Sequence, residues 1–526
     1  MRPNILLIMT DQERAVQHMA GVDLDSILPA RARLKKEGIS FENFYINSSP
    51  CTPNRAVMLT GLYSQQVWMC TNPGMLGQPS LKTEFATYAK ALRDIGYDTV
   101  YAGKWHISED MKEDNPYVLK EYGFNYYDPP NEAAGLPNQG GKDDEPIANS
   151  AVNFITSRHP QNPPFLSVVS FVNPHDIMFY YRLMNPRKPS ETYPDLQVPE
   201  NFESLKHMLQ DKPQCQAQYR AEMNLLLGKL PNDIKKTEDK NKYLDFLNYY
   251  LWLEKQVDLQ IQKVLDALDA NPDIKKNTIV IFTSDHGEMA GSHGLRGKNY
   301  VTYEEALRVP FYVVDYTNTL IPPNQQGTTR NHLGCTVDIF PTILSMVATT
   351  GDPVDKEKYY FLPGVDLTPH MVDATKPTRD QVLFAHDFVI PTIKAPSHIL
   401  GLIEGDWKGA VYDQWQMDDP NCNPQNPDEA VKSVPGCTEE ELYKRATPED
   451  RLEKNNLAQD VRYCETMNKI KTRLQTLLET ELRGPLPLEY QLISDQAQKD
   501  YVDSILAKKF PAKEGISKKD MAQIFD

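Results

Sequence analysis

Short apolar segments alternate with helical patterns along the first three-quarters of this sequence. The segments are rich in Val, Ile and Phe and are too short to be buried helices. This alternation is typical of βαβ units, and it predicts a mostly parallel, doubly wound α/β sheet flanked by helices on both faces. The predicted strands are NILLIMT (4–10), TVYA (99–102), FLSVVSFV (165–172), TIVIFT (278–283) and PFYVV (310–314).

With 526 residues, the chain exceeds what one hydrophobic core usually serves. We expect a large domain over residues 1–375, a smaller α+β domain over 376–484 and a charged helical tail over 485–526. The second region has the glycine and aromatic pattern of antiparallel strands, as in HILGLIEGDWKGAVYDQW from His398. The clearest helix covers about 242–268, where leucines and other apolar residues recur at three- and four-residue spacing.

Three segments do not fit this alternation. Residues 116–146 and 184–231 are Pro-rich and irregular, and we expect them to shape the rim of a pocket and to select the substrate. The tail from about 485 carries too few apolar residues for a core of its own. It is therefore expected to pack on the main domain or on another subunit, which would make a homo-oligomer.

Composition excludes several partners. The formal charge of −16 opposes binding to nucleic acid, so an anionic substrate needs a local basic pocket. No apolar run approaches the ~20 residues of a membrane span, and no signal-peptide pattern is found, so a soluble, cytoplasmic protein is expected. The cysteines are scattered and odd in number, which predicts reduced thiols and no zinc cluster; they are residues 51, 70, 215, 335, 422, 437 and 464.

Polar side chains follow four of the five predicted strands. Asp11-Gln12 ends the first, Lys104 and His106 follow the second, His175 follows the third, and Asp285-His286 follows the fourth. Each alone has a structural explanation, such as a helix cap or a satisfied histidine. Together they predict a functional site, because the carboxyl ends of parallel strands meet at one edge of the sheet.

Asp11, Gln12, Asp285 and His286 offer oxygen and imidazole ligands from two strand ends. This mixture suits Ca²⁺, Mg²⁺ or Mn²⁺, and we expect one divalent metal there. The alternative is that these are ordinary loop residues.

AVMLTGL (56–62) predicts a helix that starts near Pro53, which places Cys51 at the N-terminus of that helix. A helix N-terminus lowers a thiol's pKa and suits a nucleophile or an anion site. The alternative is a buried, unreactive thiol. Arg55, Lys104 and Lys298 would supply positive charge for an anion.

Cys51-Thr52-Pro53-Asn54-Arg55, followed by Leu59-Thr60-Gly61, resembles the C-x-P-x-R signature of the sulfatase family, in the alkaline-phosphatase-like superfamily. Other segments resemble sulfatase landmarks in the family's order, over about residues 3–460. They are Pro3-Asn4-Ile5 leading to Asp11, Gly103-Lys104-Trp105-His106, Ser284-Asp285-His286-Gly287, Gly297-Lys298 and Asn455-Asn456-Leu457.

The resemblance implies that a formylglycine-generating enzyme oxidises Cys51 to formylglycine, whose hydrate attacks the sulfur of a small-molecule sulfate ester. It implies a metal site of Asp11, Gln12, Asp285, His286 and residue 51, with Ca²⁺ first and Mn²⁺ or Mg²⁺ second. It further implies that Arg55 steadies the diol. The residues that contact the sulfate or assist the leaving group would be Lys104, His106, His175 and Lys298.

Gln12 departs from the pattern of many sulfatases, which have two successive aspartates here. The Asp11-Gln12 pair resembles the phosphonate monoester hydrolases and phosphodiesterases with the same chemistry. We expect a sulfate ester hydrolase, with a phosphonate or phosphodiester hydrolase as the alternative. A third hypothesis, from another class, is a non-catalytic anion- or metal-binding protein on this fold.

Overall fold

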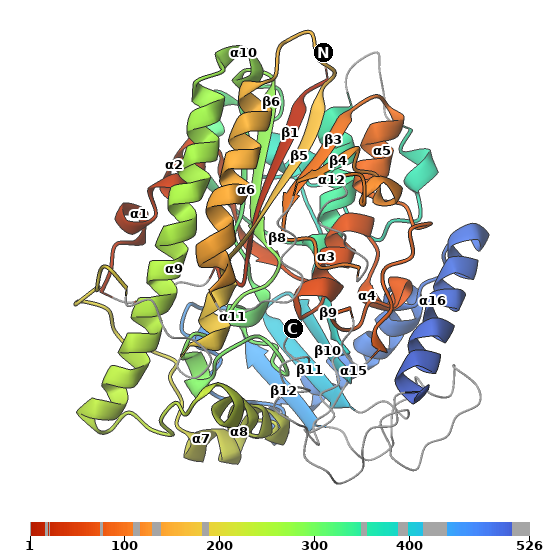
Figure 1. Ribbon diagram of the computed structural model, residues 1–526. Helices are drawn as coiled ribbons and strands as arrows, with labels where there is room; N and C mark the ends of the chain where they lie inside the picture. The colour runs from red at the N-terminus through yellow and green to blue at the C-terminus, as the bar shows by residue number, and fades with distance from the viewer. Residues whose placement is uncertain are drawn as a thin grey trace.

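The computed structural model describes residues 2–15, 19, 21–73, 77–108, 116–128, 138–180, 189–348, 355–387, 398–413 and 439–507. Cys422 and Cys437 lie outside them. The described residues form two sheets, one of eight strands in the order β4-β3-β5-β1-β6-β7-β2-β8 and one of four in the order β12-β11-β10-β9 (Figure 1). The strands of the large sheet are β1 (Asn4–Asp11), β2 (Ile39–Tyr45), β3 (Asp98–Gly103), β4 (Tyr126–Asp128), β5 (Phe165–Pro174), β6 (Thr278–Ser284), β7 (Phe311–Asp315) and β8 (Thr328–Cys335).

The large sheet is mostly parallel, as predicted. β1 lies at its centre and pairs in parallel with β5 and with β6. β3 pairs in parallel with β4 and β5, and β2 with β8. β7 runs antiparallel to both of its neighbours, β6 and β2, so the sheet is mixed.

Strand β1 shows why the sheet is covered on both faces. Its side chains alternate, and Ile5, Leu7 and Met9 belong to one hydrophobic core while Leu6 and Ile8 belong to another. Every residue of the strand is buried. A run of continuous apolar residues is therefore the pattern that this position requires.

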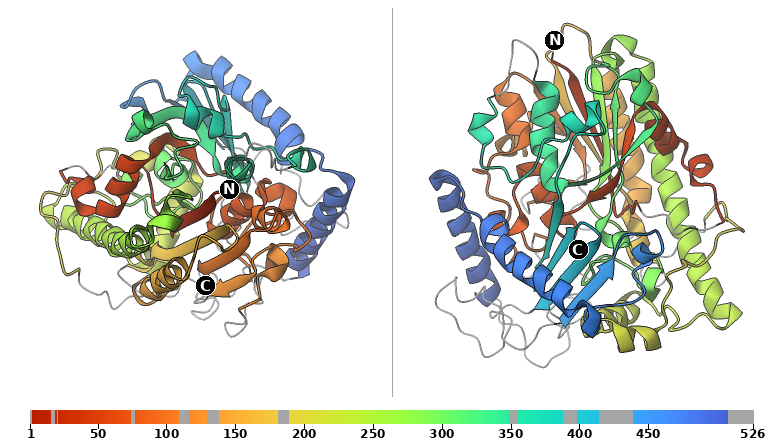
Figure 2. Two further views of the ribbon diagram at one scale, coloured as in Figure 1. Left: turned by 90° about the horizontal axis from the view of Figure 1, so that it is seen from above. Right: turned by 180° about the vertical axis from the view of Figure 1, so that it is seen from behind.

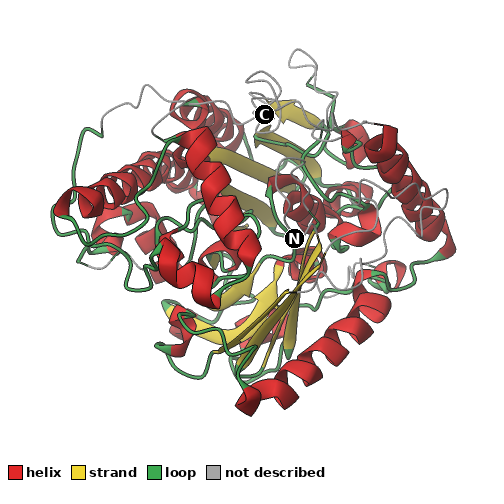
Figure 3. Cartoon of the chain, turned by 90° about the horizontal axis from the view of Figure 1, so that it is seen from below, coloured by secondary structure: helices red, strands yellow, loops and turns green. Residues whose placement is uncertain are grey.

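Helices form a layer on each side of the sheet (Figures 1 and 3). One layer contains α2 (Pro29–Glu37), α6 (Gln139–Thr156) and the long α9 (Thr237–Asp269). The other contains α3 (Cys51–Thr60), α5 (Tyr88–Asp94) and α12 (Ile339–Val347). Shorter helices are α1 (Leu24–Ile27), α4 (Ser64–Val67), α10 (Pro272–Lys275), α11 (Glu304–Leu307) and α13 (Thr368–Val372).

The small sheet is antiparallel, as predicted for the C-terminal region. It contains β9 (Gln381–His386), β10 (His398–Glu404), β11 (Trp407–Asp413) and β12 (Glu439–Lys444). Seen from behind, α15 (Cys464–Leu477) lies across these strands (Figure 2). Gly409 permits this approach, because a Cβ there would lie 2.8 Å from a side-chain carbon of Ile470.

A buried ionic network joins the small sheet to the large one through Glu304 of α11, which accepts a hydrogen bond from the hydroxyl of Tyr45 in β2. Lys408 of β11 forms ion pairs with Glu453 and Glu304, and Arg445 pairs with Glu304. Glu453 also lies with His293 and Glu305 in a cluster of metal-ligand types. The ammonium of Lys408 already compensates Glu453, so we interpret this cluster as an ion-pair network that holds the two sheets together.

Two expectations about the irregular segments need correction. Residues 184–231 contain two helices, α7 (Leu205–Asp211) and α8 (Gln214–Leu227), and residues 116–146 contain β4 and the start of α6. Prolines suggested irregular structure, but Pro213 directly precedes α8, where its missing N–H costs no hydrogen bond. Pro146 lies inside α6. The buried residues of that helix, such as Ile147 and Ala148, hold the helix against the sheet.

The described part of the tail is one helix, α16 (Leu488–Ala507), which packs near α4. The ring of Tyr501 lies 6.0 Å from that of Trp68, and Lys82 pairs with Asp500 at 2.5 Å. A homo-oligomer through the tail stays a prediction. Among the described residues, no helix combines the length and the apolar character needed to cross a bilayer.

Candidate active site

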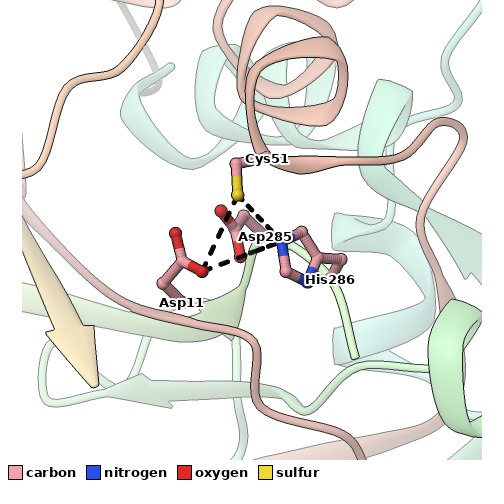
Figure 4. Close-up of side chains that lie close together, drawn as sticks. All are labelled: Asp11, Cys51, Asp285 and His286. Atoms are coloured by element: carbon pink, nitrogen blue, oxygen red, sulfur yellow. Dashed lines mark hydrogen bonds and ion pairs between the residues drawn. The ribbon is translucent and has the colours of Figure 1, made fainter. Parts of the chain in front are cut away.

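Four side chains of metal-ligand type meet where β1 and β6 end beside the start of α3. Asp11 is the last residue of β1, Asp285 and His286 follow β6, and Cys51 is the first residue of α3. One ligand atom from each lies within 4.8 Å of all the others (Figure 4). Parallel pairing of β1 with β6 brings their carboxyl ends to the same edge, so residues 274 positions apart become neighbours.

Cys51 points from the helix toward the other three side chains (Figure 4). Its Sγ lies 3.1 Å from Nε2 of His286 and 3.9 Å from Oδ1 of Asp11. Burial, reinforced by the charge of Asp11, raises the pKa of the Cys51 thiol to about 12. Of the two alternatives for Cys51, the structure favours the buried, unreactive thiol, because desolvation and a carboxylate outweigh the helix N-terminus in their effect on its pKa. As a thiol, this residue is a poor nucleophile.

Arg55 bridges the two carboxylates. Its Nε donates to Oδ2 of Asp285 at 2.7 Å and its Nη2 donates to Oδ2 of Asp11 at 2.9 Å. The remaining nitrogen, Nη1, donates to the carbonyl of Lys104 and to Oγ of Ser170. The planar guanidinium thus fixes the spacing of the two strand ends.

The pKa values of the two carboxylates are shifted in opposite directions. Burial alone would raise the pKa of Asp11, but the nearby charges of Lys104 and Arg55 hold it well below its usual range. Burial and the adjacent Asp11 raise the pKa of Asp285 to about 7. Two close carboxylates, an imidazole and the buried thiol form a donor set that a divalent cation would stabilise, since the cation relieves their repulsion.

Lys104, His106 and His175 lie at the ends of β3 and β5. Lys104 Nζ is 3.0 Å from Oδ2 of Asp11. Burial and then Lys104 hold the pKa of both histidines well below the usual range, so each ring is neutral at neutral pH. Neither ring nitrogen of His106, nor Nδ1 of His175, has a hydrogen-bond partner within the described part of the chain. Buried polar atoms of this kind are expected to face a ligand.

Lys298 and Gln12 contact each other at the same site. Lys298 Nζ donates to Oε1 of Gln12 at 2.6 Å, and Nε2 of Gln12 donates to Oε2 of Glu288 at 2.5 Å. The backbone N–H of Gln12 donates to Oδ1 of Asp285 at 3.2 Å. All ten residues predicted from the sequence are buried. Side-chain contacts link eight of them, and the other two are His106 and His175, which follow the neighbouring strands β3 and β5.

The sulfatase family matches this chain over residues 3–349. The chain belongs to the sulfatase family. Its relatives include proteins named as sulfatases, so the protein is a hydrolase of the sulfuric ester class. It is 28% identical to the "Uncharacterized sulfatase YidJ" of Escherichia coli, over 92% of this chain and 88% of the relative. It is 26% identical to an N-acetylglucosamine-6-O-sulfatase of Bacteroides thetaiotaomicron, over 81% of this chain and 82% of that enzyme.

Solved structures confirm the fold of this sulfatase. A putative sulfatase from Bacteroides thetaiotaomicron superposes with a TM-score of 0.68 at 21% identity, over 91% of this chain and 92% of that one. The phosphonate monoester hydrolase of Agrobacterium radiobacter gives a TM-score of 0.63 at 21% identity, over 91% and 95%. Both classes expected from the sequence thus share this fold.

Several contacts of the sulfatase site were not predicted from sequence. Ser170 supports Arg55, and Asn54 donates from Nδ2 to the carbonyl of Asp285 at 2.6 Å. Glu288 holds the amide of Gln12. Glu288 directly follows the predicted Ser284–Gly287 segment, and Asn54 lies inside the signature, so proximity in sequence was an available signal.

Proposed function

We propose that this sulfatase hydrolyses a sulfate ester to inorganic sulfate and an alcohol, with a formylglycine derived from Cys51 as its nucleophile. The proposal rests chiefly on the position of Cys51, whose sulfur faces His286 and Asp11 within a signature of the sulfatase family. The raised thiol pKa supports it as well, because an unmodified thiol would be a weak nucleophile here.

A single divalent metal would be held by Asp11, Gln12, Asp285, His286 and residue 51. Ca²⁺ is our first choice because the resemblance to the family implies it, and Mn²⁺ or Mg²⁺ is our second, given Gln12 and His286. When bound, such a metal lowers the pKa of a coordinated hydroxyl and so favours a nucleophile at neutral pH.

The protein's own groups provide the rest of the chemistry. Arg55 holds the two aspartates and the start of α3 in register. Lys104 and Lys298 provide positive charge for the sulfate oxygens, which the net negative chain would otherwise repel. His106 and His175 are neutral and buried, so either can donate a ring N–H to the oxygen of the departing alcohol.

A phosphonate monoester or phosphodiester hydrolase is the second candidate function. Gln12 supports it, because an amide in place of a second aspartate removes one negative charge from the site. The third hypothesis, a binding protein without catalysis, is disfavoured by the convergence of Cys51, Arg55 and both histidines. We further propose a cytoplasmic location, and small-molecule esters as substrates.

Protein produced with and without a formylglycine-generating enzyme tests the proposal. Matched aryl sulfate and aryl phosphonate substrates should be hydrolysed only by the matured protein, the sulfate faster. Mass analysis should find residue 51, as the free aldehyde, lighter than cysteine by about the mass of one water. Trapping with a hydrazine should convert it to a hydrazone, which is heavier than the aldehyde by the mass of the hydrazine less one water. Cys51→Ala should lose nearly all turnover, whereas Cys464→Ala, an exposed thiol, should not. Full activity of Cys51→Ala would overturn the mechanism.

A further inference from the structure

The side chain of Gln12 has two ends of nearly the same shape and opposite hydrogen-bonding character. Its Oε1 only accepts and its Nε2 only donates. The amide lies between Lys298, which donates to Oε1 at 2.6 Å, and Glu288, which accepts from Nε2 at 2.5 Å. An ammonium cannot accept and a carboxylate cannot donate, so these two partners together permit one orientation of the amide.

Glu288 is itself fixed by the loop that carries Lys298. Its Oε1 accepts the backbone N–H groups of Ala290 at 3.0 Å and of Gly297 at 2.7 Å. The side chain is buried. The carboxylate of Glu288 therefore binds both the backbone of the loop that leads to Lys298 and the side-chain amide of Gln12.

The backbone of Gln12 is held in place, but this does not fix the orientation of the side-chain amide. Its φ of 70° lies in the left-handed region, which non-glycine residues seldom occupy. Tyr250 donates to its carbonyl at 2.7 Å and Asp285 accepts from its N–H at 3.2 Å, so the backbone is held in place. The side-chain torsions still allow the amide to turn over. Among the described residues, the hydrogen bond to Glu288 is what opposes that rotation on the side away from Lys298.

We infer that Glu288 is a positioning residue that sets the direction of the Gln12 amide, so that its oxygen faces Lys298. The inference rests on the proposed function, which places Gln12 and Lys298 in the active site. A neutral acceptor orients the ammonium without cancelling its charge, which leaves Lys298 suited to an anionic ester. A turned amide would instead present N–H groups to the ammonium.

A charge-swap cycle tests the inference with the matured, full-length enzyme. In Glu288→Gln, the side-chain oxygen is expected to keep accepting the backbone N–H groups of Ala290 and Gly297. The new NH₂ group then faces Nε2 of Gln12, and two donors meet. We expect kcat/KM to fall about ten- to hundredfold, mainly through KM, as for loss of a charge-assisted hydrogen bond. Gln12→Glu alone places two carboxylates together and should also be impaired. The double variant restores one donor to one acceptor between residues 12 and 288, and its unfolding temperature should recover over both single variants. Its kcat/KM should stay below that of the wild type, because a carboxylate at position 12 now pairs with Lys298.

Glu441→Gln is the matched control, since Glu441 is buried and accepts hydrogen bonds from Tyr412 and Gln216 in the small sheet. A role limited to holding the fold would lower the unfolding temperature of Glu288→Gln and leave the kcat/KM of its folded fraction unchanged. That result, or a double variant no better than the worse single variant, overturns the inference. If Glu288→Gln does not fold, recovery of soluble protein by the double variant supports the inference and failure to recover it counts against it.

The unfolding temperatures of the four proteins give a readout that does not depend on activity. Coupling between residues 12 and 288 in stability, in a protein that hydrolyses neither ester, would reject the proposed function and keep the pairing. An active wild type with no coupling in stability or kcat/KM would reject the positioning role and keep the function.

Discussion

The guanidinium of Arg55 joins the end of β1 to the end of β6, since the same side chain donates to Asp11 at 2.9 Å and, through Nε, to Asp285 at 2.7 Å. A lysine has the same charge but cannot donate to both carboxylates in this planar fork. We expect Arg55→Lys to lower kcat/KM by at least about tenfold, the effect of losing one charged hydrogen bond.

The control for this variant is Arg33→Lys, because Arg33 pairs with Glu37 and Asp269 near the surface. It should keep full kcat/KM in the same assay. Equal activity of the two variants would remove Arg55 from the site.

Metal binding should depend on Asp285. We expect Asp285→Ala to remove bound metal and activity while the fold remains, because the residue lies just past the carboxyl end of β6 and outside the hydrophobic core. Elemental analysis and circular dichroism on protein purified without added metal measure both effects. Chelation of the wild type should abolish turnover, and added Ca²⁺ should restore it better than Mg²⁺. Full occupancy and normal turnover in Asp285→Ala would reject the assignment.

We expect the free energy of unfolding to decrease as the pH rises, because Glu254 titrates. Burial and the nearby Glu13 raise the pKa of Glu254 from its ordinary 4.5 to about 8, so the folded protein holds a proton that the unfolded chain releases. The stabilisation is present below pH 4.5 and is lost as pH rises to 8. Its largest slope is about 1.4 kcal/mol per pH unit.

Urea unfolding of Glu254→Gln and wild type between pH 5 and 9 tests this sign. The difference in free energy of unfolding should shift in favour of the variant as pH rises, because glutamine stays neutral. Parallel profiles for the two proteins would show that Glu254 does not titrate in this range.

Helix α16 should stabilise the main domain through Tyr501. This ring is 1% exposed and packs on Trp68. Tyr501→Ala is expected to lower the free energy of unfolding by about 3 kcal/mol, as for loss of a buried aromatic ring. Leu488→Ala, on the same helix but 75% exposed, should change it little. Truncation after Arg483 should lower stability too, and size-exclusion chromatography would reveal whether the tail also holds a homo-oligomer together.

The sequence predicted the centre of the fold better than its edges. β1, β5 and β6 are buried on both faces, so their apolar runs stand out. β8 reads TTRNHLGC and is half exposed at the edge of the sheet, and this polar pattern gave no strand signal. Helix α8 was missed because prolines around it suggested irregular structure.

The predicted site residues converge because strand ends and the family signature both mark them. Their electrostatics could not be predicted in the same way. The pKa of Cys51 depends on burial and on Asp11, 40 positions away, and the amide of Gln12 depends on Glu288, 276 positions away. Such effects follow from tertiary contacts, which no local pattern contains.

The burial of α3 has a consequence for when this enzyme becomes active. Every residue from Cys51 to Thr60 is buried, and Arg55 is tied to two strands, so a second enzyme cannot take this segment into its own catalytic site without unfolding it. Under the proposed mechanism, oxidation of Cys51 must therefore precede folding. The fraction of active enzyme is then set during synthesis by the relative rates of Cys51 oxidation and folding. Incubation of the folded protein with the maturation enzyme cannot raise this fraction afterwards.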